Sequence, residues 1–190
     1  MPAGIERERR FLVDGRGEKP WRHNSDKVQI QQHYIDSTQI FLDKTHLMYG
    51  NIQVAELTTD EIETFLKSEE WVFRLRTWNE DDIITGKSRI TSESAYELEC
   101  QIDAGIARKI LDAGAYPKVS KTRYIHMFEH QFRWEIDEFE GELAGLILAE
   151  IELGEHEIIT QIPDWCGIEL THLKGWSNAA LAKMISSQST

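Results

Sequence analysis

Hydrophobic and polar residues alternate along eight short stretches of the chain, a pattern typical of β-strands whose two faces meet different surroundings. The predicted strands are Ile5–Val13, Val28–Asp36, Trp71–Trp78, Ile83–Ile90, Tyr96–Asp103, Val119–Phe128, Phe132–Phe139 and Leu146–Leu153. Most of them follow one another through short loops, which favours antiparallel pairing. The chain has no internal repeat and no Pro/Gly/Ser-rich linker, so we expect a single domain over residues 1–190.

Three helices are predicted between or after these strands. Thr58 and Glu61 have the spacing of a capping box at the start of the first helix. Asp103 can cap a second helix that ends near Gly114, and Ser177 can cap the last one. The predicted fold is therefore mainly β (α+β), with a few peripheral helices.

The first of these helices lies in a segment of about residues 42–70, which is longer than a connection between two strands needs. We expect an inserted helical segment there. This segment is either a surface element without a role in function, a lid over one end of the structure formed by the strands, or a contact with a second copy of the chain in a homodimer.

Charged residues recur at every second position inside the predicted strands and therefore point to one face of each strand. These sets are Glu6/Glu8/Arg10, Arg74/Arg76, Lys87/Arg89, Glu97/Glu99, Lys121/Arg123, Arg133/Glu135/Asp137 and Glu150/Glu152. An ordinary antiparallel sheet with one solvated face has the same spacing. Here nearly every strand has it and the signs come in blocks, which favours a closed eight-stranded barrel with a charged interior. Such an interior suits a multiply charged anion together with a metal ion.

The overall charge narrows the range of partners. A net charge of −12 repels nucleic acid and anionic lipid, so we expect neither nucleic acid nor a membrane as partner. No stretch approaches the roughly 20 apolar residues of a membrane span, and the first ten residues lack the apolar region of a signal peptide. Two cysteines, Cys100 and Cys166, are too few for a disulfide framework. These features predict a cytoplasmic protein.

Short charged motifs follow one another along most of the chain. The first six are Glu6-Arg-Glu-Arg-Arg10, Gln32-His-Tyr34, Arg74-Leu-Arg76, Ile84-Thr-Gly-Lys87, Glu97-Leu-Glu99 and Lys121-Thr-Arg-Tyr124. Later come Trp134-Glu-Ile-Asp-Glu-Phe-Glu-Gly141, Ala149-Glu-Ile-Glu-Leu153 and Pro163-Asp-Trp-Cys-Gly-Ile-Glu-Leu-Thr171, with Asn178 before the last helix. In this order the motifs resemble those of the CYTH domain, the family of triphosphate tunnel metalloenzymes, and the later ones resemble its bacterial branch.

The resemblance implies an eight-stranded antiparallel tunnel that binds a triphosphate with Mg²⁺ or Mn²⁺ and hydrolyses it. The residues implied to hold phosphate oxygens are Arg74, Arg76, Lys87, Lys121, Arg123 and Arg133. The carboxylates implied as metal ligands are first Glu6, Glu8, Glu150 and Glu152, then Asp137, Glu97 and Glu99, directly or through hydrogen bonds to a ligand.

Inorganic tripolyphosphate is the substrate that the bacterial-type segments favour. A thiamine triphosphatase and a CYTH-type adenylate cyclase are alternatives within the same fold. A non-catalytic binder of polyphosphate or of an organic phosphate is an alternative of a different class. It is motivated by two departures from the family pattern: Arg10 stands where the family has lysine, and the arginine usual just before Glu97 is missing, with Ala95 nearby.

The resemblance also implies that Arg10 and Tyr34 cooperate in activating water. Arginine keeps its proton in proteins, so Arg10 cannot be a general base. An adjacent guanidinium favours the phenolate, so we expect the pKa of Tyr34 to lie below its ordinary value of about 10. This interpretation predicts an alkaline activity optimum that depends on Tyr34.

Overall fold

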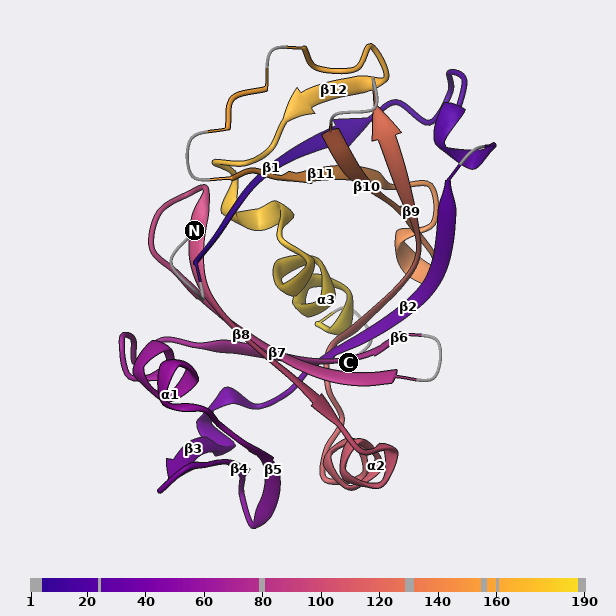
Figure 1. Ribbon diagram of the computed structural model, residues 1–190. Helices are drawn as coiled ribbons and strands as arrows, with labels where there is room; N and C mark the ends of the chain where they lie inside the picture. Colours follow the sequence, from indigo (N-terminus) through magenta and orange to yellow (C-terminus); the bar gives the residue numbers. More distant parts are fainter. Residues whose placement is uncertain are drawn as a thin grey trace.

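The computed structural model describes residues 5–23, 25–78, 81–128, 132–154, 157–159 and 161–187. Eight of its strands form a closed antiparallel barrel (Figure 1). In order around the barrel these are β1 (Ile5–Val13), β11 (Ile147–Glu152), β10 (Phe132–Phe139), β9 (Lys118–Phe128), β2 (Asp26–Tyr34), β6 (Val72–Trp78), β7 (Asp81–Arg89) and β8 (Ser94–Ile102). The ring closes because β1 pairs with both β8 and β11. The predicted barrel is confirmed, with every strand end within two residues of its expected position.

A further short strand, β12 (Cys166–Glu169), pairs with β1 beside the barrel and was not predicted. It passes so close to β1 that a Cβ on Gly167 would lie 2.9 Å from the carbonyl oxygen of Leu12. Glycine is therefore required at this point of contact between the two backbones.

The segment between β2 and β6 differs from the helical insertion that we expected. Before the helix it forms a separate antiparallel sheet of three strands, β3 (Ile40–Asp43), β4 (His46–Tyr49) and β5 (Ile52–Glu56). Each strand has only four or five residues, too few for an alternating pattern to stand out in the sequence.

All three predicted helices form at the expected residues. They are α1 (Thr59–Phe65), α2 (Ala104–Asp112) and α3 (Asn178–Ser186). Thr58 and Glu61 make the capping box of α1. The side chains of Asp103 and Ser177 accept hydrogen bonds from backbone amides in the first turns of α2 and α3.

The apolar faces of the barrel strands point outward, where they form two of the three hydrophobic cores. Phe73 and Leu75 of β6 pack under the small sheet, α1 and α2. On another part of the wall, Trp134 of β10 and Ile151 of β11 pack with Trp21. Because side chains alternate along a strand, burying these faces outside directs the charged positions into the barrel.

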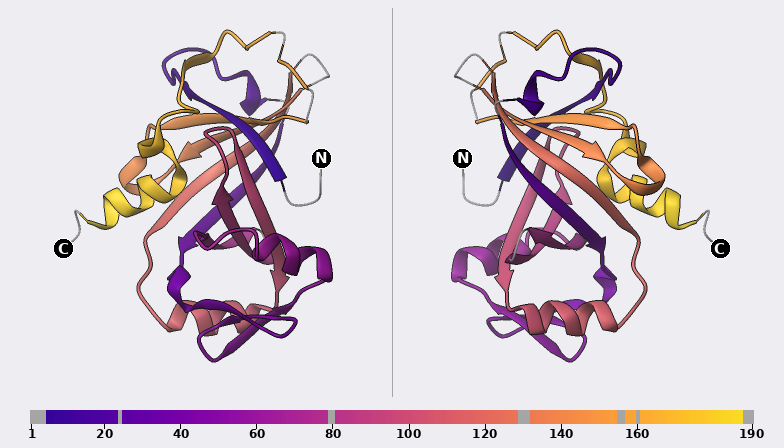
Figure 2. Two further views of the ribbon diagram at one scale, coloured as in Figure 1. Left: turned by 90° about the vertical axis from the view of Figure 1, so that its left-hand side faces the viewer. Right: turned by 90° about the vertical axis from the view of Figure 1, so that its right-hand side faces the viewer.

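The third core lies inside the barrel at one end. Val119, Phe139 and Leu148 stand an even number of residues from the inward-pointing charges of their strands, and they pack against Leu181 and Ala182 of α3. Seen along the barrel, α3 lies within the ring of strands (Figure 1), and the views from the side place it at one end (Figure 2). The helix therefore closes this end of the barrel. Among the described residues, no helix is long and apolar enough to cross a membrane.

Candidate active site

A cavity of about 1320 Å³ occupies the charged part of the barrel. Most residues that the sequence predicts for the site line it. These are Glu6, Glu8, Arg10, Tyr34, Arg74, Arg76, Lys87, Glu97, Glu99, Arg123, Arg133, Glu150 and Glu152. Lys121 and Asp137 are the two predicted site residues that do not line this cavity. The barrel thus brings together residues that are more than a hundred positions apart in the sequence.

Guanidinium groups gather on one part of the wall. Arg74 and Arg76 project from β6, and Arg123 from β9. The Nε atom of Arg74 is buried and has no hydrogen-bond partner within the described residues. Nη2 of Arg76 donates to Glu99 at 3.1 Å. Burial and then the charge of Arg74 lower the pKa of Arg76, so an anion placed between the two would be stabilised.

Carboxylates gather where β1, β8 and β11 meet. The pKa values of Glu6, Glu8 and Glu152 are all raised, first by burial and then by neighbouring carboxylates: Glu97 beside Glu6, Glu150 beside Glu8, and Glu6 beside Glu152. Repulsion of this kind disappears when a cation binds between the carboxylates. Oxygen ligands are the ligands that Mg²⁺ and Mn²⁺ prefer. In the described part of the chain, however, no three acidic, histidine or cysteine side chains are grouped closely enough to hold an ion, and Lys87 and Arg10 bind the carboxylates instead.

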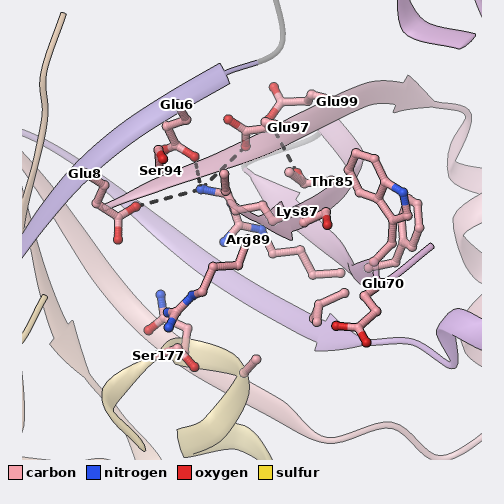
Figure 3. Close-up of a pocket in the computed structure, with 18 of the residues that line it drawn as sticks. Glu6, Glu8, Glu70, Thr85, Lys87, Arg89, Ser94, Glu97, Glu99 and Ser177 are labelled. Atoms are coloured by element: carbon pink, nitrogen blue, oxygen red, sulfur yellow. Dashed lines mark hydrogen bonds and ion pairs between the residues drawn. The ribbon is translucent and has the colours of Figure 1, made fainter. Parts of the chain in front are cut away.

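Lys87 serves as the counterion of this acidic group. Figure 3 shows its ammonium among Glu6, Glu8 and Glu97. It donates a hydrogen bond to Glu6 and lies 3.8 Å from Glu8 Oε2 and 3.6 Å from Glu97 Oε1. Despite burial, these carboxylates raise the pKa of Lys87, which therefore stays charged at neutral pH.

Glu150 joins the acidic and basic parts of the cavity. It accepts hydrogen bonds from Arg10 Nε at 2.6 Å and from Arg123 Nη2 at 3.2 Å. Burial alone would raise the pKa of Glu150, but the charges of Arg10 and Arg123 hold it well below the ordinary value. Arg10 also donates to Glu8 at 2.6 Å, so it fixes the orientation of two carboxylates at once.

Lys121 and Asp137 form a pair inside the barrel, between the cavity and the apolar core under α3, where the ammonium of Lys121 lies over the ring of Phe139. Both side chains are almost completely buried, and Lys121 donates a hydrogen bond to Asp137. Asp137 also accepts two hydrogen bonds of 2.7 Å from Arg123. Burial, followed by the charge of Arg123, lowers the pKa of Lys121 to about 8. In this structure both residues position Arg123 and neither faces the cavity.

Tyr34 lines the cavity, but its ionisation differs from our expectation. Burial raises the pKa of the phenol to about 12, although Arg74 and Arg10 act in the opposite direction. Its oxygen accepts a hydrogen bond from Gln32 Nε2 at 2.8 Å. The expectation of a lowered pKa is wrong because the guanidinium of Arg10 is held by Glu150 and Glu8 and cannot outweigh the loss of water around the phenol.

Several lining residues were absent from the predicted site. Glu135 accepts a hydrogen bond from Arg123 and forms an ion pair with Arg133 at 2.6 Å. Its place between Arg133 and Asp137 in the alternating pattern could have identified it. Lys174 and Ser177 also line the cavity, but they come from the segment before α3, where no strand periodicity marks which way a side chain points.

The segment that connects α1 with β6 lies at the opening of the cavity. Leu66 and Val72 line it and are 68% and 50% exposed. Trp71, between them, is fixed by hydrogen bonds from Nε1 to the carbonyl oxygens of Phe65 and Ser68, 3.1 and 3.0 Å long. The inserted segment is therefore placed where a lid would be, and its role as one stays a prediction.

Comparison with known proteins agrees with this geometry. No family model matches the chain. A relative from Acetivibrio thermocellus named inorganic triphosphatase is 40% identical over 111 residues, which are 58% of this chain and 70% of that protein. Another of the same name from Nitrosomonas europaea is 33% identical over 114 residues, 59% of this chain and 75% of the relative. The crystal structure of an inorganic triphosphatase aligns with a TM-score of 0.55 and 25% identity over 93% of each chain.

Proposed function

The chain belongs to the inorganic triphosphatase family of CYTH-domain proteins, and from this we propose that its barrel hydrolyses inorganic tripolyphosphate. The observation that carries the proposal is the division of the cavity wall. Arg74, Arg76 and Arg123 supply fixed positive charge on one part, and Glu6, Glu8 and Glu152 form an acidic group on another. A polyphosphate with a divalent cation has the complementary arrangement of charges.

The residues that would hold the metal ion are Glu6, Glu8, Glu152 and Glu150, with Glu97 and Glu99 nearby on β8. Mg²⁺ or Mn²⁺ bound there would offset the negative charge of the phosphates and lower the pKa of a water molecule. Burial and mutual repulsion raise the pKa of three of these carboxylates, which supports a role in binding a cation.

The chain's own residues contribute binding and orientation. Arg74 and Arg76 can donate hydrogen bonds to phosphate oxygens and so hold the substrate in place. Arg123 already donates to Asp137, Glu135 and Glu150 and contributes its charge. Arg10 keeps Glu8 and Glu150 in position and does not exchange a proton. The Tyr34 phenol stays protonated at neutral pH and can donate a hydrogen bond into the cavity.

Phosphate release from tripolyphosphate tests this proposal. We expect release in the presence of Mg²⁺ or Mn²⁺, its loss with excess EDTA, and its recovery when the metal is added back. The exposed residue Arg16, which pairs with Asp14 outside the cavity, supplies a control variant, Arg16→Ala, that should keep full activity. Binding of tripolyphosphate without turnover would instead support the non-catalytic phosphate binder.

The same assay with other triphosphates separates the alternatives within the fold. Release of phosphate from thiamine triphosphate at a higher kcat/KM than from tripolyphosphate would contradict the proposed substrate. Formation of a cyclic nucleotide and pyrophosphate from ATP would indicate the cyclase.

Replacing Tyr34 with phenylalanine should lower kcat about tenfold, because one hydrogen bond to a charged group contributes roughly 1.5 kcal/mol. With a pKa of about 12, Tyr34 does not change its protonation between pH 7 and 10. We therefore expect the pH profiles of Tyr34→Phe and wild type to be parallel over this range. Tyr124→Phe, on the outer face of β9, is the matched control. Loss of an alkaline limb in Tyr34→Phe would show that Tyr34 acts as a base after all.

A further inference from the structure

Arg89, the last residue of β7, is a cation of the cavity wall that has no part in the function proposed above. It follows Lys87 by two residues, so both side chains point to the inner face of the strand. Arg89 lines the cavity, and Figure 3 shows both residues on this part of the wall. The guanidinium of Arg89 makes no hydrogen bond or ion pair with the described residues.

Most other cations of the cavity wall are already held by carboxylates. Lys87 donates a hydrogen bond to Glu6, and Arg133 forms an ion pair with Glu135. An anion that binds to such a cation competes with the carboxylate. Arg89 has no carboxylate to give up, so its charge and its donors are available to an anion inside the cavity.

The pairing of the strands places a small residue beside Arg89. In the register of β7 with β8, Arg89 lies opposite Ala95, and in the register of β8 with β1, Ala95 lies opposite Glu6. Residues directly opposite each other in an antiparallel pair point to the same face, with Cβ atoms about 4.5–5.5 Å apart. Glu6, Ala95 and Arg89 therefore form one row across three strands, and all three line the cavity.

Ala95 is also the residue that stands where the resemblance to the CYTH domain implies an arginine. A side chain at position 95 starts from the same row of the wall as that of Arg89. An arginine side chain is longer than the distance between two such neighbouring Cβ atoms. The guanidinium of Arg89 can therefore reach the part of the cavity that an arginine at position 95 would reach, and the methyl group of Ala95 does not obstruct it.

We propose that Arg89 binds a phosphate group of the substrate and takes the place of the arginine that is absent at position 95. The neighbouring strand then supplies the guanidinium that β8 lacks. The identity of the ligand as a polyphosphate rests on the proposed function, whereas the equivalence of positions 89 and 95 rests on the register of β7 and β8.

The first measurement is the affinity of tripolyphosphate by calorimetry, in EDTA to prevent turnover. Arg89→Ala should weaken binding about tenfold, because a charge-assisted pair of hydrogen bonds to phosphate is lost. Its free energy of unfolding should stay that of wild type, since the guanidinium has no partner among the described residues. Arg108→Ala is the matched control, because Arg108 is an exposed arginine of α2 that does not line the cavity.

The second measurement moves the arginine to the neighbouring strand. Ala95→Arg, introduced into Arg89→Ala, should restore the affinity to within about threefold of wild type, a difference of well under one order of magnitude. In the wild-type background Ala95→Arg should improve binding less, because the two guanidinium groups would compete for one place and repel each other. Ala95→Lys is a second rescue variant. It restores the charge without the planar pair of donors and should recover part of the affinity.

These variants distinguish binding by Arg89 from other roles. Wild-type affinity in Arg89→Ala would overturn the proposal, as would an equal loss in Arg108→Ala, which would indicate attraction by overall charge. Equal effects of Ala95→Arg in the two backgrounds would show that positions 89 and 95 serve different places and would overturn it too. A structural role for Arg89 predicts that neither rescue variant recovers affinity, and that result would also contradict the proposal.

The outcomes also separate this proposal from the proposed function. Wild type that binds tripolyphosphate with the predicted pattern among the variants but does not hydrolyse it would refute the enzyme and leave the role of Arg89 in place. Wild type that hydrolyses it, with Arg89→Ala unaffected in affinity, would refute the role of Arg89 alone. Absence of tripolyphosphate binding by wild type would overturn both.

Discussion

Replacing Glu150 with glutamine should reduce the rate of tripolyphosphate hydrolysis at least a thousandfold, which corresponds to about 4 kcal/mol in the transition state. Glutamine keeps the shape of the side chain but removes its charge. The proposed metal site loses one of its ligands, and Arg10 and Arg123 lose the carboxylate that holds both. Removing one partner from a buried charge network typically costs about 3–5 kcal/mol, so we also expect a lower free energy of unfolding.

The measurement is kcat over a range of Mg²⁺ concentrations, together with thermal unfolding. Glu142→Gln, at an exposed turn after β10, removes the same charge away from the cavity and should behave as wild type. Wild-type activity of Glu150→Gln at limiting Mg²⁺ would show that Glu150 neither binds the metal nor orients the arginines during turnover.

Replacing Arg74 with alanine should weaken tripolyphosphate binding about a hundredfold or more. A charge-assisted hydrogen bond contributes roughly 1.5–3 kcal/mol, and a guanidinium can make two such bonds to one phosphate. The buried Nε of Arg74 has no hydrogen-bond partner in the described structure. Burial and the charge of Arg123 lower the pKa of Arg74, but Tyr34, Glu97 and Glu6 outweigh them and raise it, so the surroundings favour the charged guanidinium. We therefore expect Arg74→Ala to lower the free energy of unfolding as well, and its affinity is to be measured at a temperature where thermal unfolding shows the variant to be folded.

Two further variants make this test specific. Arg74→Lys keeps the charge but loses the planar pair of donors, so its affinity should lie between those of wild type and Arg74→Ala. Arg16 is 91% exposed at the side chain, and Arg16→Ala should bind normally. Equal losses in Arg74→Ala and Arg16→Ala would mean that tripolyphosphate is attracted by overall charge and not held by the cavity.

The sequence predicted the barrel well because apolar and charged residues alternate along every barrel strand, with one face of the strand packed outside the barrel and the other facing its interior. In β6, Phe73 and Leu75 must be covered from outside, which leaves Arg74 and Arg76 facing inward. The same alternation sets the faces of β10 and β11. The predicted site lines one cavity for that reason.

The features of the site that could not be predicted from the sequence depend on contacts between segments that are distant in the chain. Alternation gives the face on which Lys121 and Asp137 lie, but not that they bind each other and lie outside the lining of the cavity. The sequence likewise does not show that the Arg10 guanidinium donates hydrogen bonds to Glu150 and Glu8. For this reason the sequence analysis predicted a lowered pKa for Tyr34, whereas the structure gives a raised one. The strands β3 to β5 are too short for periodicity to identify.

The ion pairs inside the barrel couple the two ligands of the proposed reaction. With neither ligand bound, Arg10 holds Glu150 and Glu8, and Arg123 holds Glu135. A polyphosphate binding alone would draw arginines away from carboxylates that then have no counterion, and a divalent cation binding alone would do the reverse. When both bind, every charge has a partner again. We therefore expect each ligand to raise the affinity for the other, and by reciprocity the two enhancements should be equal. On the proposed function, the barrel should bind the metal–polyphosphate complex cooperatively and respond less to either ion by itself.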